Sequence, residues 1–538
     1  MDRNEPSSAG NPASPSWQDA LWLVAVWYAL FLTGLGAQEL RLEEPRRVEP
    51  ALGMIESGNW AVSTIGGEAY YRKPPFLNWL IAASFQATGV VDEFTARLPS
   101  ATMVLLLALT AWRTGRSWLG REGAFGAGLI LLTTIAVVDK GRLAEIEAAH
   151  MALTGMACAV WLEAWAGGRL SAGRWAATGL LLGLALLAKG PAHLPFFLGL
   201  VVLCQGLAGS AGELRRGRFW LGVSCLLLPA LLWLLAIRGH WQAAAAVWQG
   251  EVTDRFQQAT PWTELLLRAL REPLGSVLNL MPWALLALAF VRPAAWKELD
   301  EPQRRFVRAA GWLALVTIVL LPAVPGYRPR YSMPVYGPVL MALALGGERL
   351  RQGARGWSIW WRALQIVGLL AALAGAAGAV MSAGAWRWTA VAGAVLAVVA
   401  LRRGRRPEQI RPGLWRWSAL VLAAAGLAAW SLAAPRMAQR QRLRPAAERV
   451  LAQVPAGQKL LLLRPGYVRY VFYLRGRHEF IARPEDLPAQ ETVLLTTVAQ
   501  SDTLAQRTGR RVEVLAEERL DRLGEGQAVR LLRLGQAP

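Results

Sequence analysis

The sequence has little cysteine, little histidine and little charge. Its three Cys residues all lie inside apolar runs, which argues against a disulfide framework or a cysteine-based metal site. Its four His residues are scattered without metal-ligand spacing. Only 18% of the 538 residues are charged, whereas a soluble domain carries about 25%. These shortages exclude a soluble globular protein, and the high hydrophobic content excludes a disordered chain.

Hydrophobic residues instead make up 54% of the chain, with a mean hydropathy of +0.29. A transmembrane helix needs about 20 mostly apolar residues to cross a hydrocarbon core of roughly 30 Å. The sequence predicts a polytopic α-helical membrane protein with about thirteen such helices, within residues 21–434. The expected spans are 21–37, 100–112, 123–138, 148–166, 174–188, 192–208, 219–237, 274–291, 309–324, 333–346, 363–382, 386–401 and 414–434.

Charge in the short loops predicts the orientation, because Lys and Arg favour the cytoplasmic side. The Arg-rich loops are 113–121, 169–174, 215–218, 292–308 and 402–411. The loops between them hold most of the acidic residues near the membrane, so we expect them to face outward. Residues 1–20 then form a cytoplasmic tail before an uncleaved first helix, since the leader is not positively charged. The basic residues are dispersed among cytoplasmic loops, which fits anionic lipid rather than nucleic acid.

Residues 435–538 differ in composition from the rest and predict a small α/β domain on the outer face. An amphipathic helix is expected around 446–453, and strands at 459–463, 491–497, 512–515 and 528–534. Residues 467–474 fit either a helix or a strand. This domain carries no catalytic motif, so we expect a lid or a docking module.

The ionisable residues near the membrane gather at the outer ends of helices. A transporter would place them near the bilayer midplane instead, so the pattern favours a reaction at the outer interface. The first outward loop, 38–95, begins with about forty residues of alternating acids, bases and aromatics, and loops of that length usually have a function. A solvated surface network of its charges is the alternative.

Three blocks of this loop occur in an order typical of one superfamily: Glu43-Glu44-Pro45-Arg46, Glu56-Ser57-Gly58-Asn59-Trp60 and Tyr71-Arg72-Lys73-Pro74-Pro75. They resemble the first periplasmic loop of GT-C glycosyltransferases, in the group of protein O-mannosyltransferases and bacterial lipid A aminoarabinose transferases. Later blocks resemble the same group: Arg142 followed by Glu145 and Glu147, then Lys189-Gly190-Pro191, then Arg330-Tyr331-Ser332-Met333-Pro334.

The resemblance implies a GT-C fold in a bacterial inner membrane and an enzyme that moves a sugar, with inversion, from a polyprenyl-phosphate donor. The acceptor would be a lipid A-like glycolipid or a protein hydroxyl. Cations suited to the donor phosphate are Arg46, Lys73, Lys189 and Arg330, with Tyr331 as a further hydrogen-bond donor. Glu43 stands where the family has its catalytic Asp.

Several alternatives stay open at this point. Glu44 could replace Glu43 as the catalytic acid. The resemblance also implies a second outward acidic site, at which Glu147 is the catalytic candidate and Glu145 is the alternative. A structural role, in a salt bridge to Arg142 or Lys140, is equally open. His193 could touch the donor or simply hydrogen-bond within the protein. No cofactor motif is present, although Glu43 or Glu147 could hold a divalent cation. The other candidate functions are a transporter or flippase of polyprenyl-linked glycans and an inactive glycan-binding scaffold.

Overall fold

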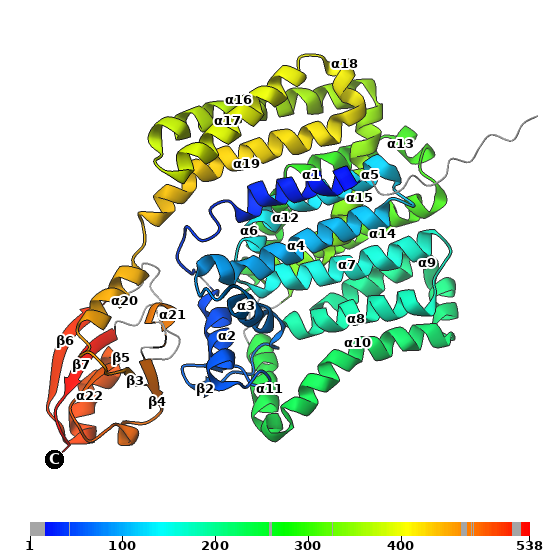
Figure 1. The fold of residues 1–538 in the computed structure, drawn as a ribbon. Coiled ribbons are helices and arrows are strands. Elements are labelled where there is room, and N and C mark those ends of the chain that lie inside the picture. Colours follow the sequence, from blue (N-terminus) through cyan, green and yellow to red (C-terminus); the bar gives the residue numbers. More distant parts are fainter. Residues whose placement is uncertain are drawn as a thin grey trace, which may run out of the picture.

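The computed structural model describes residues 17–537 apart from 42, 258–260, 325–326, 464–470, 475, 477 and 519–528. It has two parts, a large bundle of helices and a small α/β domain at the C-terminal end (Figure 1). The first outward loop lies at the end of the bundle that faces this small domain.

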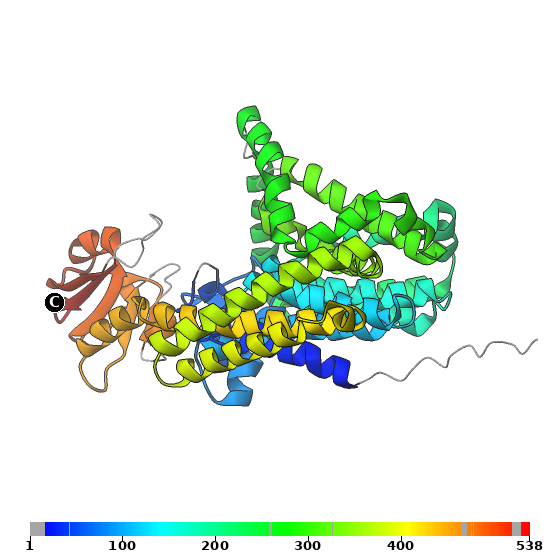
Figure 2. The same ribbon diagram turned by 90° about the horizontal axis from the view of Figure 1, so that it is seen from above.

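Long helices running along a common direction make up the bundle (Figure 1). In chain order its elements are α1 (Trp17–Trp27), η1 (Tyr28–Leu32), α4 (Glu93–Gly115), α5 (Gly120–Thr133), α6 (Ile135–Gly141), α7 (Ile146–Ala166), α8 (Ala172–Lys189), η2 (Pro191–His193), α9 (Leu194–Leu214), α10 (Gly217–Ala236), η3 (Arg238–His240), α11 (Trp241–Gln257), α12 (Trp262–Asn279), η4 (Trp283–Val291), α13 (Pro293–Lys297), α14 (Glu301–Val319), η5 (Leu321–Ala323), η6 (Pro329–Val335), α15 (Tyr336–Gln352), α16 (Ala354–Met381), α17 (Ala385–Arg403), α18 (Pro407–Ile410), η7 (Arg411–Gly413) and α19 (Leu414–Ala438). Helices α16, α17 and α19 pack on one another along one side of the bundle (Figure 2).

The chain is a polytopic membrane protein. Within the described residues, seven helices are long and apolar enough to cross a bilayer, or nine if each of two bent helix pairs is one span. Each of the spans expected from the sequence overlaps a helix of the bundle. The count of about thirteen stays a prediction, since several of these helices are shorter or more polar than a typical span.

Two of the spans that the sequence predicted as single helices are bent and broken in the structure. The prediction was wrong for these two segments. Segment 123–138 divides into α5 and α6, bent by 59°. At the bend the hydroxyls of Thr133 and Thr134 donate to carbonyls four residues back, which distorts a helix. Segment 274–291 divides between the end of α12 and η4, bent by 103°. Here Pro282 interrupts the helix because it lacks an N–H donor.

The first outward loop is largely folded. It contains α2 (Pro45–Ser57), the hairpin strands β1 (Thr64–Ile65) and β2 (Glu68–Ala69), and α3 (Phe76–Thr88). Pro45 occupies the first position of α2, where its missing N–H costs nothing. Gly58 ends the same helix in the left-handed region, at φ 69°. The loop thus presents its charged residues from a defined backbone.

The C-terminal domain is a five-stranded mixed sheet with three helices. Its elements are α20 (Leu443–Ala452), β3 (Leu460–Leu463), α21 (Val471–Leu474), β4 (His478–Ile481), η8 (Pro484–Asp486), β5 (Thr492–Thr497), α22 (Val498–Thr508), β6 (Val512–Glu518) and β7 (Val529–Leu534). The sheet order is β4-β3-β5-β7-β6, with β3 parallel to β4 and β5 and the remaining pairs antiparallel. The four strands expected from the sequence coincide with β3, β5, β6 and β7. Strand β4 and helix α22 were not expected, and residues 467–470 lie outside the described part.

This domain is attached to the first loop through specific contacts. The Glu39 carboxylate accepts hydrogen bonds from the backbone N–H groups of Arg442, Leu443 and Arg444, at 2.8 to 3.1 Å, where α20 begins. Arg444 also binds both carboxylate oxygens of the buried Glu93, each at 2.9 Å. The loop is therefore held between the bundle and the C-terminal domain.

Candidate active site

Glu44 is the most deeply anchored acid of the first loop. Its side chain is fully buried, and its two oxygens accept from Arg97 Nε and Nη2 at 2.7 and 2.8 Å. They also accept from the backbone N–H groups of Arg41, at 2.8 Å, and Ala144, at 2.9 Å. Arg97 in turn donates to three backbone carbonyls in the segment 35–39. The pair fixes the loop on α4, and both oxygens of Glu44 are occupied.

Glu43 has the opposite surroundings. Its carboxylate is 26% exposed and lies 3.1 Å from Arg46 Nη1. The two adjacent acids therefore have different environments: Glu44 is buried within the protein, and Glu43 lies beside solvent. Of the two, Glu43 has the carboxylate that an incoming group can reach.

A second cluster lies where α7, α8 and η6 meet. Glu147, in the first turn of α7, is only 4% exposed. Its Oε1 atom lies 3.4 Å from Lys189 Nζ and 3.2 Å from Arg330 Nε. The Lys189 ammonium stands over the Tyr331 ring, 5.2 Å from its centroid. The structure thus brings together residues from three segments that are far apart in the sequence.

The local sequence explains how Lys189 reaches this point. Lys189 is the last residue of α8, and Gly190 follows with a φ of 97°, a backbone conformation that L side chains rarely adopt. Pro191 then starts a new helical turn. The Lys-Gly-Pro order therefore ends one helix abruptly and leaves the ammonium at its C-terminal end, where the helix dipole favours a cation.

The first loop and this second cluster belong to one electrostatic site. Lys73, between β2 and α3, is close enough to Lys189 for their positive charges to repel. Arg47, at the start of α2, interacts with the Glu147 charge from the loop side. Lys189 and Arg330 thus lie beside the buried Glu147 carboxylate, and positive charges of the first loop act on this cluster as well. Such a surplus of cations suits a phosphate, which accepts several hydrogen bonds at once.

The partners proposed for the acids of the 140–147 segment need correction. Lys140 binds Glu145 rather than Glu147, with 3.0 Å between Lys140 Nζ and Glu145 Oε2. Arg142 contacts neither acid through an ion pair; within the described residues it donates to the carbonyls of the segment 30–33 and stacks on Trp430, 3.5 Å from the ring centroid. Glu147 therefore faces the cations, while Glu145 is turned toward α6.

A buried histidine pair lies behind the second cluster, and of its two members only His193 was a candidate from the sequence. His150 Nε2 lies 3.1 Å from His193 Nδ1, and His193 Nε2 lies 3.0 Å from the Leu182 carbonyl. His193 Nδ1 also lies 3.2 Å from the Gly190 carbonyl, so each ring nitrogen of His193 is within hydrogen-bonding distance of a backbone carbonyl. The pair joins α7 to the turn after Lys189. His193 is therefore an internal hydrogen-bonding residue in this structure.

Indole groups from the next part of the chain also hold the loop. Trp233 Nε1 donates to the Ala61 carbonyl at 3.0 Å, and Trp248 Nε1 donates to the Tyr71 carbonyl at 2.8 Å. These bonds tie α10 and α11 to the segment that precedes Lys73. Within the described residues, no group of three or more His, Cys, Asp or Glu is placed to hold a metal ion.

One further acid of the loop is unusual. Glu49 on α2 is 8% exposed, and its Oε1 atom accepts from the Gly66 N–H at 2.6 Å, which pins the β1–β2 hairpin. Its Oε2 atom is buried and has no hydrogen-bond partner in the described structure. Burial raises the pKa of this carboxyl to about 7.

Comparison with known proteins gives a consistent family resemblance. Residues 72–235 match the family model described as dolichyl-phosphate-mannose-protein mannosyltransferase. An undecaprenyl phosphate-alpha-4-amino-4-deoxy-L-arabinose arabinosyl transferase of Pseudomonas savastanoi pv. phaseolicola is 26% identical over 66% of this chain and 65% of its own length. The protein of the same name from Shewanella sediminis is 27% identical over 59% of this chain and 57% of its own length. The chain thus matches less than two thirds of the length of these relatives.

The fold is that of a solved structure. The crystal structure of ArnT from Cupriavidus metallidurans bound to undecaprenyl phosphate has a TM-score of 0.68, with 19% identity, and covers 96% of this chain and 98% of that one. Its apo form gives a TM-score of 0.66 with 18% identity, covering 97% and 98% of the two chains. These matches confirm the resemblance to GT-C glycosyltransferases of the lipid A aminoarabinose transferase group.

Proposed function

We propose that this chain is a glycosyltransferase that moves a sugar from a polyprenyl-phosphate donor to an acceptor at the outer face of a bacterial inner membrane. The observation that carries the proposal is the convergence of Lys189 and Arg330 on Glu147, with Lys73 close by. The activity for which the relatives are named supports the donor class, because their names describe arabinosyl transfer with an undecaprenyl phosphate-linked sugar.

In the proposed reaction an acceptor oxygen attacks the anomeric carbon, and the bond from that carbon to the phosphate oxygen breaks. The electron pair leaves with polyprenyl phosphate, and the configuration at the carbon inverts. Arg46, Lys73, Lys189 and Arg330 neutralise the charge that grows on the departing phosphate, and Tyr331 donates a hydrogen bond. Stabilising such developing charge is usually the largest catalytic contribution.

Glu43 is assigned to the acceptor side. Its partly exposed carboxylate can orient or deprotonate an attacking hydroxyl, or stabilise positive charge that develops on the sugar. Glu44 is assigned a scaffold role because both its oxygens are already hydrogen-bonded. Glu147 holds the phosphate-binding cations in place until the donor arrives.

The proposed topology follows the loop charges. The N-terminal tail is cytoplasmic, about thirteen helices cross the membrane, and the loop 38–95 together with the domain 435–538 lies in the periplasm. The donor and membrane lipids reach the site laterally. The acceptor, a lipid A-like glycolipid or a protein hydroxyl, approaches from the periplasm.

The deciding experiment incubates purified protein with an undecaprenyl-phosphate sugar and each acceptor type, and measures released undecaprenyl phosphate. Lys73→Ala and Glu43→Gln should each lower turnover by at least a hundredfold while the protein still purifies as a monodisperse sample. Matched controls are Lys297→Ala and Glu56→Gln, which change exposed residues outside the site. Wild-type turnover in both site variants would overturn the proposal.

The same assay decides between the proposal and its main alternative. A transporter or flippase in liposomes would move the labelled donor across the bilayer without releasing undecaprenyl phosphate. Adding a chelator to the transferase assay tests whether a divalent cation takes part.

A further inference from the structure

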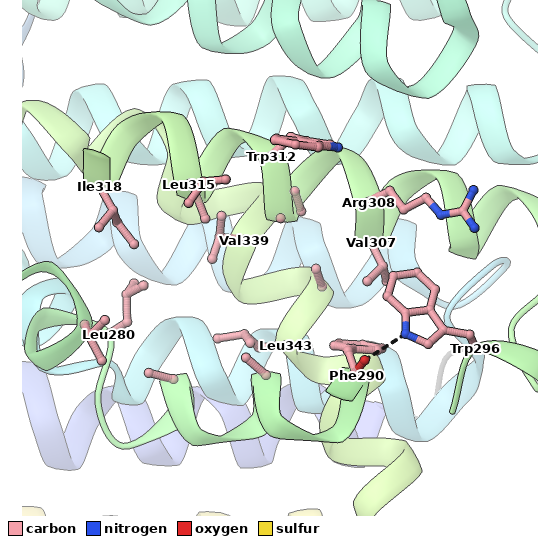
Figure 3. Close-up of a pocket in the computed structure, with 17 residues that line it drawn as sticks. Leu280, Phe290, Trp296, Val307, Arg308, Trp312, Leu315, Ile318, Val339 and Leu343 are labelled. Atoms are coloured by element: carbon pink, nitrogen blue, oxygen red, sulfur yellow. Dashed lines mark hydrogen bonds between the residues drawn. The ribbon is translucent and has the colours of Figure 1, made fainter. Parts of the chain in front are cut away.

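A cavity lies within the bundle, away from the candidate active site. It has a volume of about 490 Å³ and is lined by α12, η4, α13, α14 and α15. Figure 3 shows Leu280, Leu315, Ile318, Val339 and Leu343 along it, with Trp296 and Arg308 at one end. Every other lining residue is apolar or Gly, so the cavity suits a hydrocarbon chain.

The cavity runs along α14 and its length fits one leaflet of a bilayer. From Arg308 to Ile318 the helix rises by about 15 Å, which is half of a hydrocarbon core of roughly 30 Å. Trp312 and Leu315 are 58% and 50% exposed on this helix, so the cavity is open to the lipid side. Trp296 and Trp312 near its charged end fit an interfacial position.

The charged end faces away from the candidate active site. Helix α14 leads from Arg308 through η5 to η6, the element that carries Arg330. Arg308 thus lies in the N-terminal half of a segment long enough to span the membrane, Glu301–Ala323, and Arg330 lies in the element that follows its C-terminal end. A lipid whose headgroup is held at Arg308 must come from the leaflet opposite the one that supplies the phosphate to Lys189 and Arg330.

Arg308 is available for an anionic headgroup. Among the described residues Arg308 lies over the Trp296 ring, 5.6 Å from its centroid, and its charge also acts on Glu301, although the two form no ion pair within 4 Å. The nearby acid Glu301 is bound by Arg305 at 2.8 Å, and Glu298 by Arg349 at 2.9 Å. The Trp296 N–H is used as well, since it donates to the Phe290 carbonyl at 2.8 Å. The Arg308 guanidinium at this end of the cavity is therefore suited to bind a phosphate.

We propose that this cavity binds one acyl chain of an anionic glycerophospholipid from the leaflet opposite the active site, with the headgroup phosphate on Arg308. The polyprenyl tail of a donor would enter from the other end and would bring no charge to Arg308. The proposal stands independently of the transferase function.

The test is native mass spectrometry of the purified full-length protein, delipidated and then titrated with phosphatidylglycerol or phosphatidylcholine. Gly311 lines the cavity, and a Cβ there would meet no atom within 4 Å, so Gly311→Leu fills the space without a backbone clash. Arg308→Gln removes the charge alone. Gly173→Leu, whose Cβ also meets no atom within 4 Å, and Arg403→Gln, an exposed Arg at the end of α17, are the matched controls.

Wild type and both controls should retain one phosphatidylglycerol in preference to phosphatidylcholine. Arg308→Gln should lower the phosphatidylglycerol-bound fraction at least threefold, and Gly311→Leu should abolish binding of both lipids. Equal binding of the two lipids by wild type, unchanged binding by Arg308→Gln, or a retained lipid that proves to be polyprenyl phosphate would overturn the proposal. Arg308 is exposed, so its variant decides the matter even if Gly311→Leu does not fold.

Discussion

Glu44 and Arg97 form a bidentate ion pair in which both side chains are buried, with exposed fractions of 0% and 2%. The pair joins the first loop to α4, and through the Ala144 N–H it also reaches the turn before α7. One contact thus places the Glu43 segment beside the helix that carries Glu147. The relative position of the two halves of the candidate site depends on it.

Replacing Glu44 should therefore damage the structure rather than the chemistry. Glu44→Gln leaves Arg97 charged and without its ionic partner in a buried place, at a cost of about 3–5 kcal/mol. We expect a lower thermal unfolding temperature and a loss of activity that follows the loss of folded protein. Glu43→Gln should abolish activity with an unchanged unfolding temperature. If Glu44→Gln were inactive but as stable as wild type, Glu44 would be the catalytic acid.

Glu147 competes with the donor phosphate for Lys189 and Arg330. Glu147→Gln removes that competitor, so undecaprenyl phosphate should bind more tightly and leave more slowly. Steady-state kinetics should show a lower KM for the donor, although uniformly tighter binding does not speed the chemical step. The kcat should fall about tenfold, because the product undecaprenyl phosphate leaves more slowly. Glu163→Gln on the same helix, whose acid binds Arg174 away from this cluster, is the control. A raised KM would contradict the competition and would mean that Glu147 is needed for donor binding.

The order of short motifs along the chain was enough to predict part of the candidate site. The motif order singled out Glu147, Lys189, Arg330 and Tyr331, and the fold brings these residues together. Their roles at the site stay predictions. Neighbouring acids were harder to assign. Residues one or two positions apart in a turn or helix point in different directions, so only the fold shows that Glu44 is turned into the scaffold.

Long-range partners could not be predicted at all. The bonds between Glu39 and the start of α20 join residues about four hundred positions apart, and neither motif nor periodicity carries that information. The bend between α12 and η4 was missed because an apolar run of 18 residues looks the same whether it is straight or broken. Pro282 was the available signal.

The Glu39 contacts make the C-terminal domain a support for the first loop. Glu39→Ala removes the acceptor for three backbone N–H groups that are exposed or only partly buried, and a hydrogen bond of this kind contributes about 0.5–1.5 kcal/mol. We expect faster proteolysis within the connector 436–442 and a severalfold drop in activity. Glu68→Ala, an exposed acid of the same loop, should behave as wild type. Unchanged proteolysis of Glu39→Ala would show that other contacts suffice to hold the domain.

Glu49 should make the stability of the folded loop depend on pH. Its pKa is raised from 4.5 to about 7 in the folded protein, so the folded state keeps a proton that the unfolded chain releases. Stability is then highest below pH 4.5, falls as the pH rises through 7, and is constant above that. This rise in the pKa from 4.5 to about 7 corresponds to roughly 3 kcal/mol.

Glu49→Gln isolates this contribution, since glutamine is neutral throughout and can still accept the hydrogen bond from Gly66. Thermal unfolding measured between pH 5 and pH 8 should show little difference between the variant and wild type at the acidic end. At pH 8 the variant should be the more stable protein, because it no longer buries a charged carboxylate. Glu56→Gln, exposed on the same helix, should follow wild type at every pH. If Glu49→Gln and wild type lost stability in parallel as the pH rose, Glu49 would be charged in the folded protein and stabilised by a partner.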